Sequence, residues 1–531
     1  MHQLRIAVYR EQFAGIHDLS AAAHLMTDRQ KTRLLAACLA LFKLGIHLAT
    51  STNYEMHRDG LLYYALGRHP AWGYVSVPPL AGLLARFTTS LMGNTAFAMR
   101  LLPAVIGSLS VLVIAKIIEE LEGGRTAIVI GSLAFILSPA FLRSNTLFQP
   151  VSFGQFFWLL SAYIIVKLLK TQQARLWVPL FIVWGAGFNN KYSIAFLIAA
   201  FFAGLVLTSK RKLILSRWFL TGLAAGFVMI LPNLIWQYMH NWPLVFHMAE
   251  LQKHQLSHVT VTEFLTDQVF MNINGLPVWV AGLAAVLFSG RFRTYRTVGY
   301  MYLFTLGILL ALRGKSYYTL GLYPALFAFG GAALDTYAKK WVKYAVVVTG
   351  TAVSAVMAPI SLPVCTHARV AQLSRPVAVF VNRWEDGRIY TVPQDFADMT
   401  GWKELVRIVD ETYRSVDGTE RARCRIYTEN YGQAGAVMFY GRTRGLPEPI
   451  CFNDNFLLWA PDTIGSGSLI YVGHDIGDVE RLFGSCIETG QVRDPYFRED
   501  GLRVFLCTEP SDSLGTVYAQ TVSRLKQKYR K

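Results

Sequence analysis

The stretch RWFLTGLAAGFVMILPNLIWQ (217–237) has one charged residue, Arg217, at its first position. A helix needs roughly 20 mainly apolar residues to cross the hydrocarbon core of a bilayer. This stretch meets that requirement and therefore predicts a membrane-spanning helix.

Ten further stretches resemble it, so we expect an α-helical polytopic membrane protein with about eleven spans and accept ten to thirteen. The composition agrees: 53% of the residues are hydrophobic and 16% are charged, against about 25% charged in an average soluble protein. These values exclude a disordered protein, a coiled coil and an ordinary cytosolic enzyme. The predicted spans cover about 32–50, 98–119, 126–142, 152–169, 176–189, 192–208, 217–237, 275–290, 297–312, 317–335 and 342–361.

The loops between these spans carry their cations unevenly. Fifteen Lys and Arg residues lie in one alternate set of loops, within 116–125, 167–175, 210–217, 291–296 and 339–343. Only four lie in the opposite short turns: Arg143, Lys191, Arg313 and Lys315. The positive-inside rule places the richer set in the cytoplasm, so the net charge of +17 reflects topology, and nucleic-acid binding is not predicted.

This orientation divides the chain into three parts of a multi-pass protein of the inner (plasma) membrane. Residues 1–31 are predicted to be a cytoplasmic N-terminal segment, and 32–362 a transmembrane domain. Its long loops 51–97 and 238–274 would face outward, and two stretches of the first loop look like short amphipathic helices on the membrane surface. For an odd number of spans, 363–531 form a soluble extracytoplasmic domain.

The C-terminal part is polar, with short apolar runs that alternate with turns and helical patterns, which predicts a small α/β domain. Five of the six cysteines lie there: Cys365, Cys424, Cys451, Cys486 and Cys507. An oxidising exterior would permit disulfides, but buried free thiols are an equally good interpretation. No tight ligand spacing predicts a zinc site.

Several side chains at the outer edge could do chemistry. Asp59, four positions after Glu55, would share a helix face with it and could act as a general base; a solvated loop acid is the alternative. The cations Arg143, Lys191, Arg313 and Lys315 end predicted helices on the same side and could hold a phosphate; contact with lipid headgroups is the alternative.

Four histidines of the second outer loop follow one another at steps of seven, seven and four residues: His240, His247, His254 and His258. On one continuous helix they would share a face and could bind a metal. Pro243 interrupts that helix, so a surface helix with polar histidines is the simpler interpretation.

An ordered series of motifs resembles membrane glycosyltransferases of the GT-C superfamily, of the protein O-mannosyltransferase type (family 39), which are related to the lipid A aminoarabinose transferases. The run RDGLLYYALGRHPAWGYVSVPPLAGLLARF (58–87) is similar to their first outer loop. Further matches follow in order: RLLPAVIGSL (100–109), NTLFQPVSFGQFFW (145–158), NNKYSIAF (189–196), LPNLIWQYMHNWP (231–243), GKSYYTLGLYPALFAFGGAAL (314–334) and ENYGQAGAVMFYG (429–441).

The resemblance implies transfer of a sugar from a polyprenyl-phosphate donor to an acceptor hydroxyl of an envelope glycan, lipid or protein on the outer face, with inversion. Asp59 matches the family's presumed general base, and Lys191 and Lys315 match its phosphate-binding residues. Arg313, Arg143 and Tyr317 complete the predicted substrate-binding set.

The sequence departs from the family at several acidic positions. Gly60 stands where relatives carry Glu, and Ser76 stands where an acid precedes Pro-Pro-Leu. In the aminoarabinose branch that acid binds a metal, so no cofactor is predicted firmly and a divalent metal stays open. Gln149 and Ser152 stand where many relatives have a second carboxylate.

Two other functions stay open. The missing acids are compatible with a catalytically inactive relative that binds a lipid-linked sugar. A transporter of lipid-linked sugars is the third possibility, but such proteins tend to show internal repeats and broken helices at the bilayer midplane, and the sequence shows no repeat.

Overall fold

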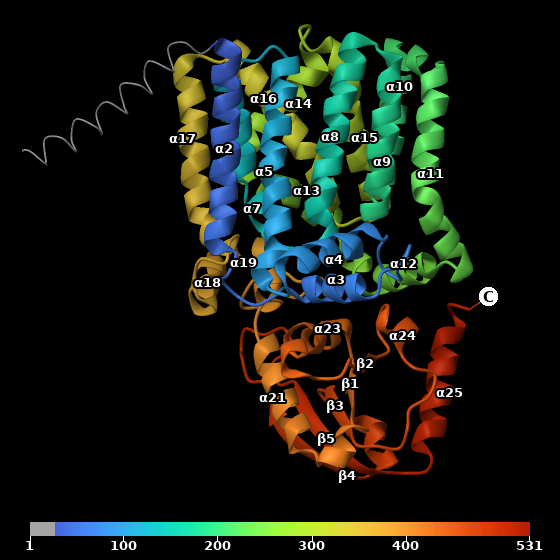
Figure 1. The fold of residues 1–531 in the computed structure, drawn as a ribbon. Coiled ribbons are helices and arrows are strands. Elements are labelled where there is room, and N and C mark those ends of the chain that lie inside the picture. The colour runs from blue at the N-terminus through green and yellow to red at the C-terminus, as the bar shows by residue number, and fades with distance from the viewer. Residues whose placement is uncertain (1–26, 531) are drawn as a thin grey trace, which may run out of the picture.

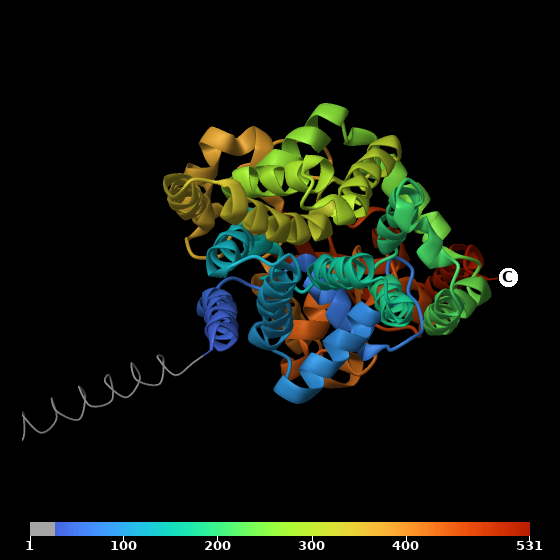
Figure 2. The same cartoon turned by 90° about the horizontal axis from the view of Figure 1, so that it is seen from above.

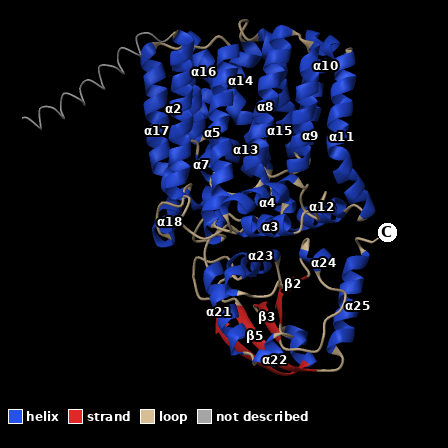
Figure 3. Cartoon of the chain, in the orientation of Figure 1, coloured by secondary structure: helices blue, strands red, loops and turns tan. Residues whose placement is uncertain are grey.

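The computed structural model describes residues 27–530 and shows a helical bundle with a smaller domain at one end. In Figure 1 the bundle lies above and the smaller domain below, and Figure 3 shows that the strands belong to the smaller domain. The predicted cytoplasmic segment 1–31 lies mostly outside the described residues, and the first described helix, α2, starts at Asp28.

Five helices are long and apolar enough to span a membrane: α2 (Asp28–Thr50), α5 (Ala96–Glu120), α8 (Pro150–Thr171), α11 (Arg217–Met239) and α17 (Lys340–Met357). The bent pair α13 (Val261–Phe270) and α14 (Leu276–Phe288) would make a sixth. Apolar side chains of α11 are largely exposed, as expected for a helix that contacts lipid. Figure 2 shows α2 and α17 at the periphery of the bundle.

Each of the eleven predicted ranges contains a helix, but six of these helices have only 12 to 16 residues. They are α6 (Arg125–Ile136), α9 (Trp177–Asn190), α10 (Ile194–Val206), α14, α15 (Arg296–Ala311) and α16 (Tyr323–Tyr337). Short 3₁₀ turns extend four of them at the N-terminal end; the one before α16 is η6 (Ser316–Leu322). The predicted span 126–142 divides into α6 and α7 (Pro139–Ser144).

The cation-rich loops meet at one end of the bundle. Arg291 pairs with Glu122, and Arg125 pairs with Asp28 at the start of α2. The opposite end contacts the C-terminal part, where Arg58 N–H donates to the carbonyl of Asp398 at 3.0 Å. The two ends of the bundle thus differ as the distribution of charge predicts.

Three helices of the two predicted outer loops lie at the end next to the smaller domain: α3 (Arg58–Arg68), α4 (Leu80–Met92) and α12 (Pro243–His254). The first two confirm the helices expected in the loop 51–97. α3 is largely buried, because it packs against α4 and against α23 (Tyr431–Tyr440) of the smaller domain.

The chain reaches the smaller domain through α18 (His367–Ser374), α19 (Ala378–Val381) and α20 (Gln394–Ala397). A five-stranded sheet then follows in the order β2-β1-β3-β5-β4, parallel from β2 to β3 and antiparallel at β5 and β4. Its strands are β1 (Arg425–Thr428), β2 (Ile450–Cys451), β3 (Leu469–Gly473), β4 (Phe483–Gln491) and β5 (Arg503–Pro510). The helices around it are α21 (Trp402–Ser415), α22 (Gly418–Arg421), α23, α24 (Phe456–Trp459) and α25 (Leu514–Gln527).

One disulfide joins the last two strands. Cys486 and Cys507 stand opposite each other in the β4–β5 register and are bonded, whereas Cys365, Cys424 and Cys451 are free thiols. Both interpretations of the cysteines therefore hold, each for part of the set.

Candidate active site

Asp59 lies in the first turn of α3, where the bundle meets the smaller domain. His57 caps this helix, and its Nδ1 accepts the backbone N–H of Asp59 at 3.1 Å. An N-terminal position favours a carboxylate because the free N–H groups of the helix point toward it. Glu55 precedes α3, so the expected common helix face of Glu55 and Asp59 is wrong.

Two neutral donors hold the carboxylate of Asp59. The amide Nε2 of Gln149 donates to Oδ2 at 3.1 Å, and the phenol of Tyr431 donates to Oδ1 at 3.0 Å. Gln149 occupies the position where many relatives have a second acid. An amide there donates a hydrogen bond to Asp59, whereas a second carboxylate has no proton to donate and would repel it.

Tyr431 was not among the predicted site residues, although its motif was recognised. It is the first residue of α23, and the guanidinium of Arg58 lies 4.4 Å from the centre of its ring. The motif predicts no role for Tyr431, because the sequence does not show that two residues 372 positions apart are in contact.

Lys191 lies in the turn between α9 and α10, with its ammonium 5.0 Å from the ring centre of Tyr317 and 4.5 Å from that of Tyr318. No carboxylate among the described residues comes within ion-pair distance of it. Burial and the charge of Lys315 lower the pKa of Lys191 to about 7, against smaller opposing effects of Asp59 and Glu385. An anion bound beside the lysine would restore its charge.

Lys315 lies at the start of η6, and its Nζ contacts Oε1 of Glu385 at 2.6 Å. Its ammonium is 5.8 Å from the ring centre of Tyr317. Tyr317 is therefore close to both lysines. The structure thus brings together four of the predicted residues: Asp59, Lys191, Lys315 and Tyr317.

The two remaining predicted residues are placed differently. Arg143 of α7 pairs with Asp395 of α20 at 3.1 Å and so belongs to a neighbouring cluster. Arg313 has a positive φ of 50° and an exposed side chain. It forms no ion pair within residues 27–530, and nothing in its surroundings links it to Asp59.

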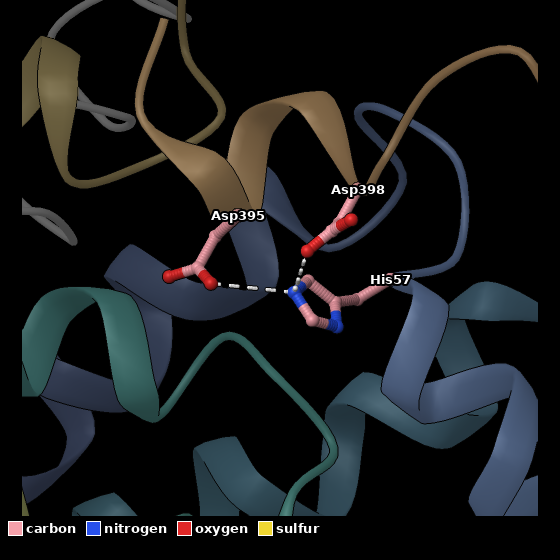
Figure 4. Close-up of side chains that lie close together, drawn as sticks. All are labelled: His57, Asp395 and Asp398. Carbon is pink, nitrogen blue, oxygen red and sulfur yellow. Dashed lines mark hydrogen bonds and ion pairs between the residues drawn. The ribbon is translucent and has the colours of Figure 1, made fainter. Parts of the chain in front are cut away.

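The neighbouring cluster consists of His57, Asp395 and Asp398 (Figure 4). Nε2 of His57 lies 3.3 Å from Asp395 and 3.6 Å from Asp398. Burial works to raise the pKa of Asp395, but Arg143 and His57 overcome it and hold that pKa at about 2.

These three side chains are spaced as metal ligands could be, but their hydrogen bonds argue against a metal. Because Nδ1 of His57 accepts an N–H, the ring carries its proton on Nε2 and offers no lone pair there. Arg143 and Arg498 already pair with the two carboxylates. We interpret the cluster as a support for the start of α3.

The other metal candidates also lack a ligand set. Ser76 offers no carboxylate. The loop histidines lie on separate segments: α12 begins at Pro243 and ends at His254, His240 precedes it after α11, and His258 follows it in a 3₁₀ turn. One helix carrying all four is therefore wrong, as Pro243 indicated.

Residues 76–236 match the family described as dolichyl-phosphate-mannose-protein mannosyltransferase. No curated protein matches the chain in sequence. Two crystal structures of ArnT from Cupriavidus metallidurans share the fold, each with a TM-score of 0.60. The form bound to undecaprenyl phosphate is 15% identical over 89% of this chain and 97% of ArnT. The apo form is 12% identical over 90% of this chain and 98% of ArnT.

These findings confirm the resemblance to GT-C membrane glycosyltransferases. The family match covers the stretch from the second half of the first outer loop to α11, and the similarity of fold covers most of the chain.

Proposed function

We propose that this protein, a relative of the GT-C membrane glycosyltransferases, transfers a sugar from a polyprenyl-phosphate carrier to an acceptor hydroxyl. The observation that carries the proposal is the grouping of Asp59, Lys191 and Lys315, whose charges act on one another in a buried setting. The bound undecaprenyl phosphate of ArnT supports a lipid phosphate as the ligand of the two lysines.

In the proposed reaction, Asp59 takes the proton of the acceptor hydroxyl. The acceptor oxygen forms a bond to the anomeric carbon of the sugar, and the bond from that carbon to the phosphate oxygen breaks. The electron pair of the broken bond goes to the phosphate, and Lys191 and Lys315 stabilise the added charge. A single displacement inverts the configuration at the anomeric carbon. The reaction as written uses only these three side chains, the acceptor and the lipid phosphate.

We place this reaction on the extracytoplasmic side. The cation-rich loops lie at the end of the bundle away from Asp59, and the positive-inside rule assigns that end to the cytoplasm. The disulfide Cys486–Cys507 supports the same orientation, since structural disulfides are typical of oxidising compartments. The donor sugar and the acceptor, whether glycan, lipid or protein, stay unspecified.

A transfer assay tests the proposal. Membranes with and without the protein receive a polyprenyl phosphate that carries a radiolabelled sugar, and the label is followed into acceptor material. Label in the acceptor that depends on the protein supports the enzyme. Movement of intact donor across the bilayer would instead identify a transporter, and binding without transfer would identify an inactive relative.

A further inference from the structure

Glu385 belongs to the connection between the bundle and the smaller domain, and its side chain contacts the site. It lies between α19 and α20, and its backbone N–H donates to Oε1 of Gln394 at 3.0 Å. Its carboxylate meets Nζ of Lys315 at 2.6 Å, where the lysine side chain is only 13% exposed. This carboxylate therefore stands against one of the two ammonium groups assigned to the phosphate.

Glu385 remains ionised in this position. Burial works to raise the pKa of Glu385, but the charge of Lys315 and its hydrogen bond overcome this effect and lower the pKa. The negative charge of Glu385 also acts on Lys191, Tyr317 and Tyr431. Glu385 is thus a central anion of the site, although the sequence pattern gave no reason to select it.

A phosphate on Lys315 would face this carboxylate. Two anions that share one ammonium repel each other, and the repulsion is strong where water is largely excluded. A phosphate has more oxygens and, as a monoester, carries roughly −1.5 to −2 charges at pH 7. It can therefore displace a carboxylate, but it loses affinity in doing so.

We propose that Glu385 is an exchangeable counter-ion of Lys315, which the phosphate of the polyprenyl carrier displaces on binding and which returns to the lysine when the carrier leaves. This inference rests on the proposed function. The donor is a phosphodiester with one negative charge, whereas the product is the more highly charged monoester. Competition from Glu385 weakens the hold of the two lysines on that product and so favours its release.

The test measures the binding of undecaprenyl phosphate to the purified full-length protein in lipid nanodiscs. The variant Glu385→Gln keeps the size of the side chain and removes its charge. We expect its Kd to be about 5- to 20-fold lower than that of the wild type, since a competing anion is removed. During turnover, added undecaprenyl phosphate should inhibit the variant at correspondingly lower concentrations.

A matched control is Glu120→Gln. Glu120 also pairs with lysines, Lys170 at 3.4 Å and Lys167 at 3.9 Å, but it lies at the other end of the bundle. Glu120→Gln changes the net charge of the protein by the same amount as Glu385→Gln. An unchanged Kd in this control therefore shows that the tighter binding in Glu385→Gln comes from the position of Glu385 and not from the net charge. Equal tightening in both variants would overturn the inference.

The double variant Lys315→Gln/Glu385→Gln isolates the exchange. The tightening caused by Glu385→Gln should be smaller in the Lys315→Gln background than in the wild type, because competition for the shared ammonium is gone and only repulsion at a distance remains. If Glu385 serves instead to position Lys315, Glu385→Gln will bind more weakly or equally, and the inference fails. If Glu385→Gln does not fold, Glu385→Asp provides the same test, because its carboxylate is drawn back by one methylene and should tighten binding to a smaller extent.

The failure of the proposed function would look different. In that case Lys191→Gln and Lys315→Gln would both bind undecaprenyl phosphate as tightly as the wild type. If Lys315→Gln weakens binding while Glu385→Gln does not tighten it, the lysine site stands and the exchange alone is wrong.

Discussion

The two ends of the helical bundle use the same kinds of charged residue in opposite ways. At the cation-rich end, Lys116 and Glu119 pair at 3.0 Å with side chains 45% and 35% exposed. At the end next to the smaller domain, His57 and Asp398 are only 5% and 3% exposed, and Lys191 has no carboxylate partner among the described residues.

The difference in burial indicates which charges matter for chemistry. An exposed ion pair contributes about 0–1 kcal/mol to stability, whereas a buried charge costs several kcal/mol unless it is well compensated. Charges at the first end are sufficiently explained by membrane topology. Charges at the second end are maintained at a cost, which is typical of a functional site.

The largest expected effect comes from the half-buried carboxylate of Asp59. Asp59→Asn keeps one of the two oxygens that accept hydrogen bonds from Gln149 and Tyr431 and removes the base. Transfer should therefore fall by about 10²- to 10³-fold while donor binding changes little. Initial rates with the labelled donor, together with a separate binding measurement, check this. Glu119→Gln, at the exposed end, is the control and should keep the wild-type rate; transfer at the wild-type rate by Asp59→Asn would remove Asp59 from the mechanism.

Replacing Gln149 with an acid would place two carboxylates side by side at the end of the bundle next to the smaller domain. Gln149→Glu places a second carboxylate about where the amide now donates to Asp59. Two such groups resist simultaneous ionisation, so the acid limb of the pH–activity profile should move upward by about one unit, with up to tenfold loss at low pH. The profile from pH 4 to 9 tests this, and an unmoved limb would show that the two side chains do not interact during turnover.

Lys191 should make lipid binding sensitive to pH. With a pKa lowered to about 7 by burial and Lys315, it is charged below that pH and neutral above it. The affinity for undecaprenyl phosphate should therefore fall as the pH rises, by roughly fivefold between pH 7 and 8. The second pKa of a phosphate monoester is about 6, so the ligand changes little in this range.

Lys191→Arg supplies the comparison for this titration, because arginine stays charged at every pH used. Its binding should be nearly independent of pH between 7 and 9. The same slope in both proteins would assign the titration to another group.

The smallest effect should come from the contact made by the smaller domain. Tyr431→Phe keeps the ring beneath Arg58 and removes only the phenol that donates to Asp59. A hydrogen bond to a charged group contributes about 1.5–3 kcal/mol. Because this bond holds Asp59 both before and during the transfer, the rate should change only about two- to fivefold, with the melting temperature little changed. Tyr440→Phe, on the same helix, removes a phenol that accepts the N–H of Met56 and is the control; equal effects in both variants would mean that the loss is structural.

Much of the fold follows from the sequence, because apolar length and the distribution of cations are local properties. The stretch 217–237 predicts α11 almost to its last residue. The bounds of the shorter helices follow less well from the sequence, since a 3₁₀ turn before a helix can have the same apolar composition as the helix itself.

The site could be predicted only where a motif marks it. Asp59, Lys191 and Lys315 were selected by family resemblance and by their positions at predicted helix ends. Tyr431 and Glu385 reach the same place from distant segments, and neither the periodicity nor the composition of a sequence reports such contacts. Arg313 shows the reverse error, because its neighbour Lys315 turns inward while Arg313 stays exposed.

The hydrogen bond from Tyr431 to Asp59 joins residues 372 positions apart. The ribosome must therefore finish nearly every apolar helix before Tyr431, the second hydrogen-bond partner of Asp59, has been translated. On the proposed mechanism, a nascent or prematurely terminated chain could occupy the bilayer with its reaction centre incomplete. Because Tyr431 is translated after the helical bundle, full activity would require that synthesis has continued past residue 431.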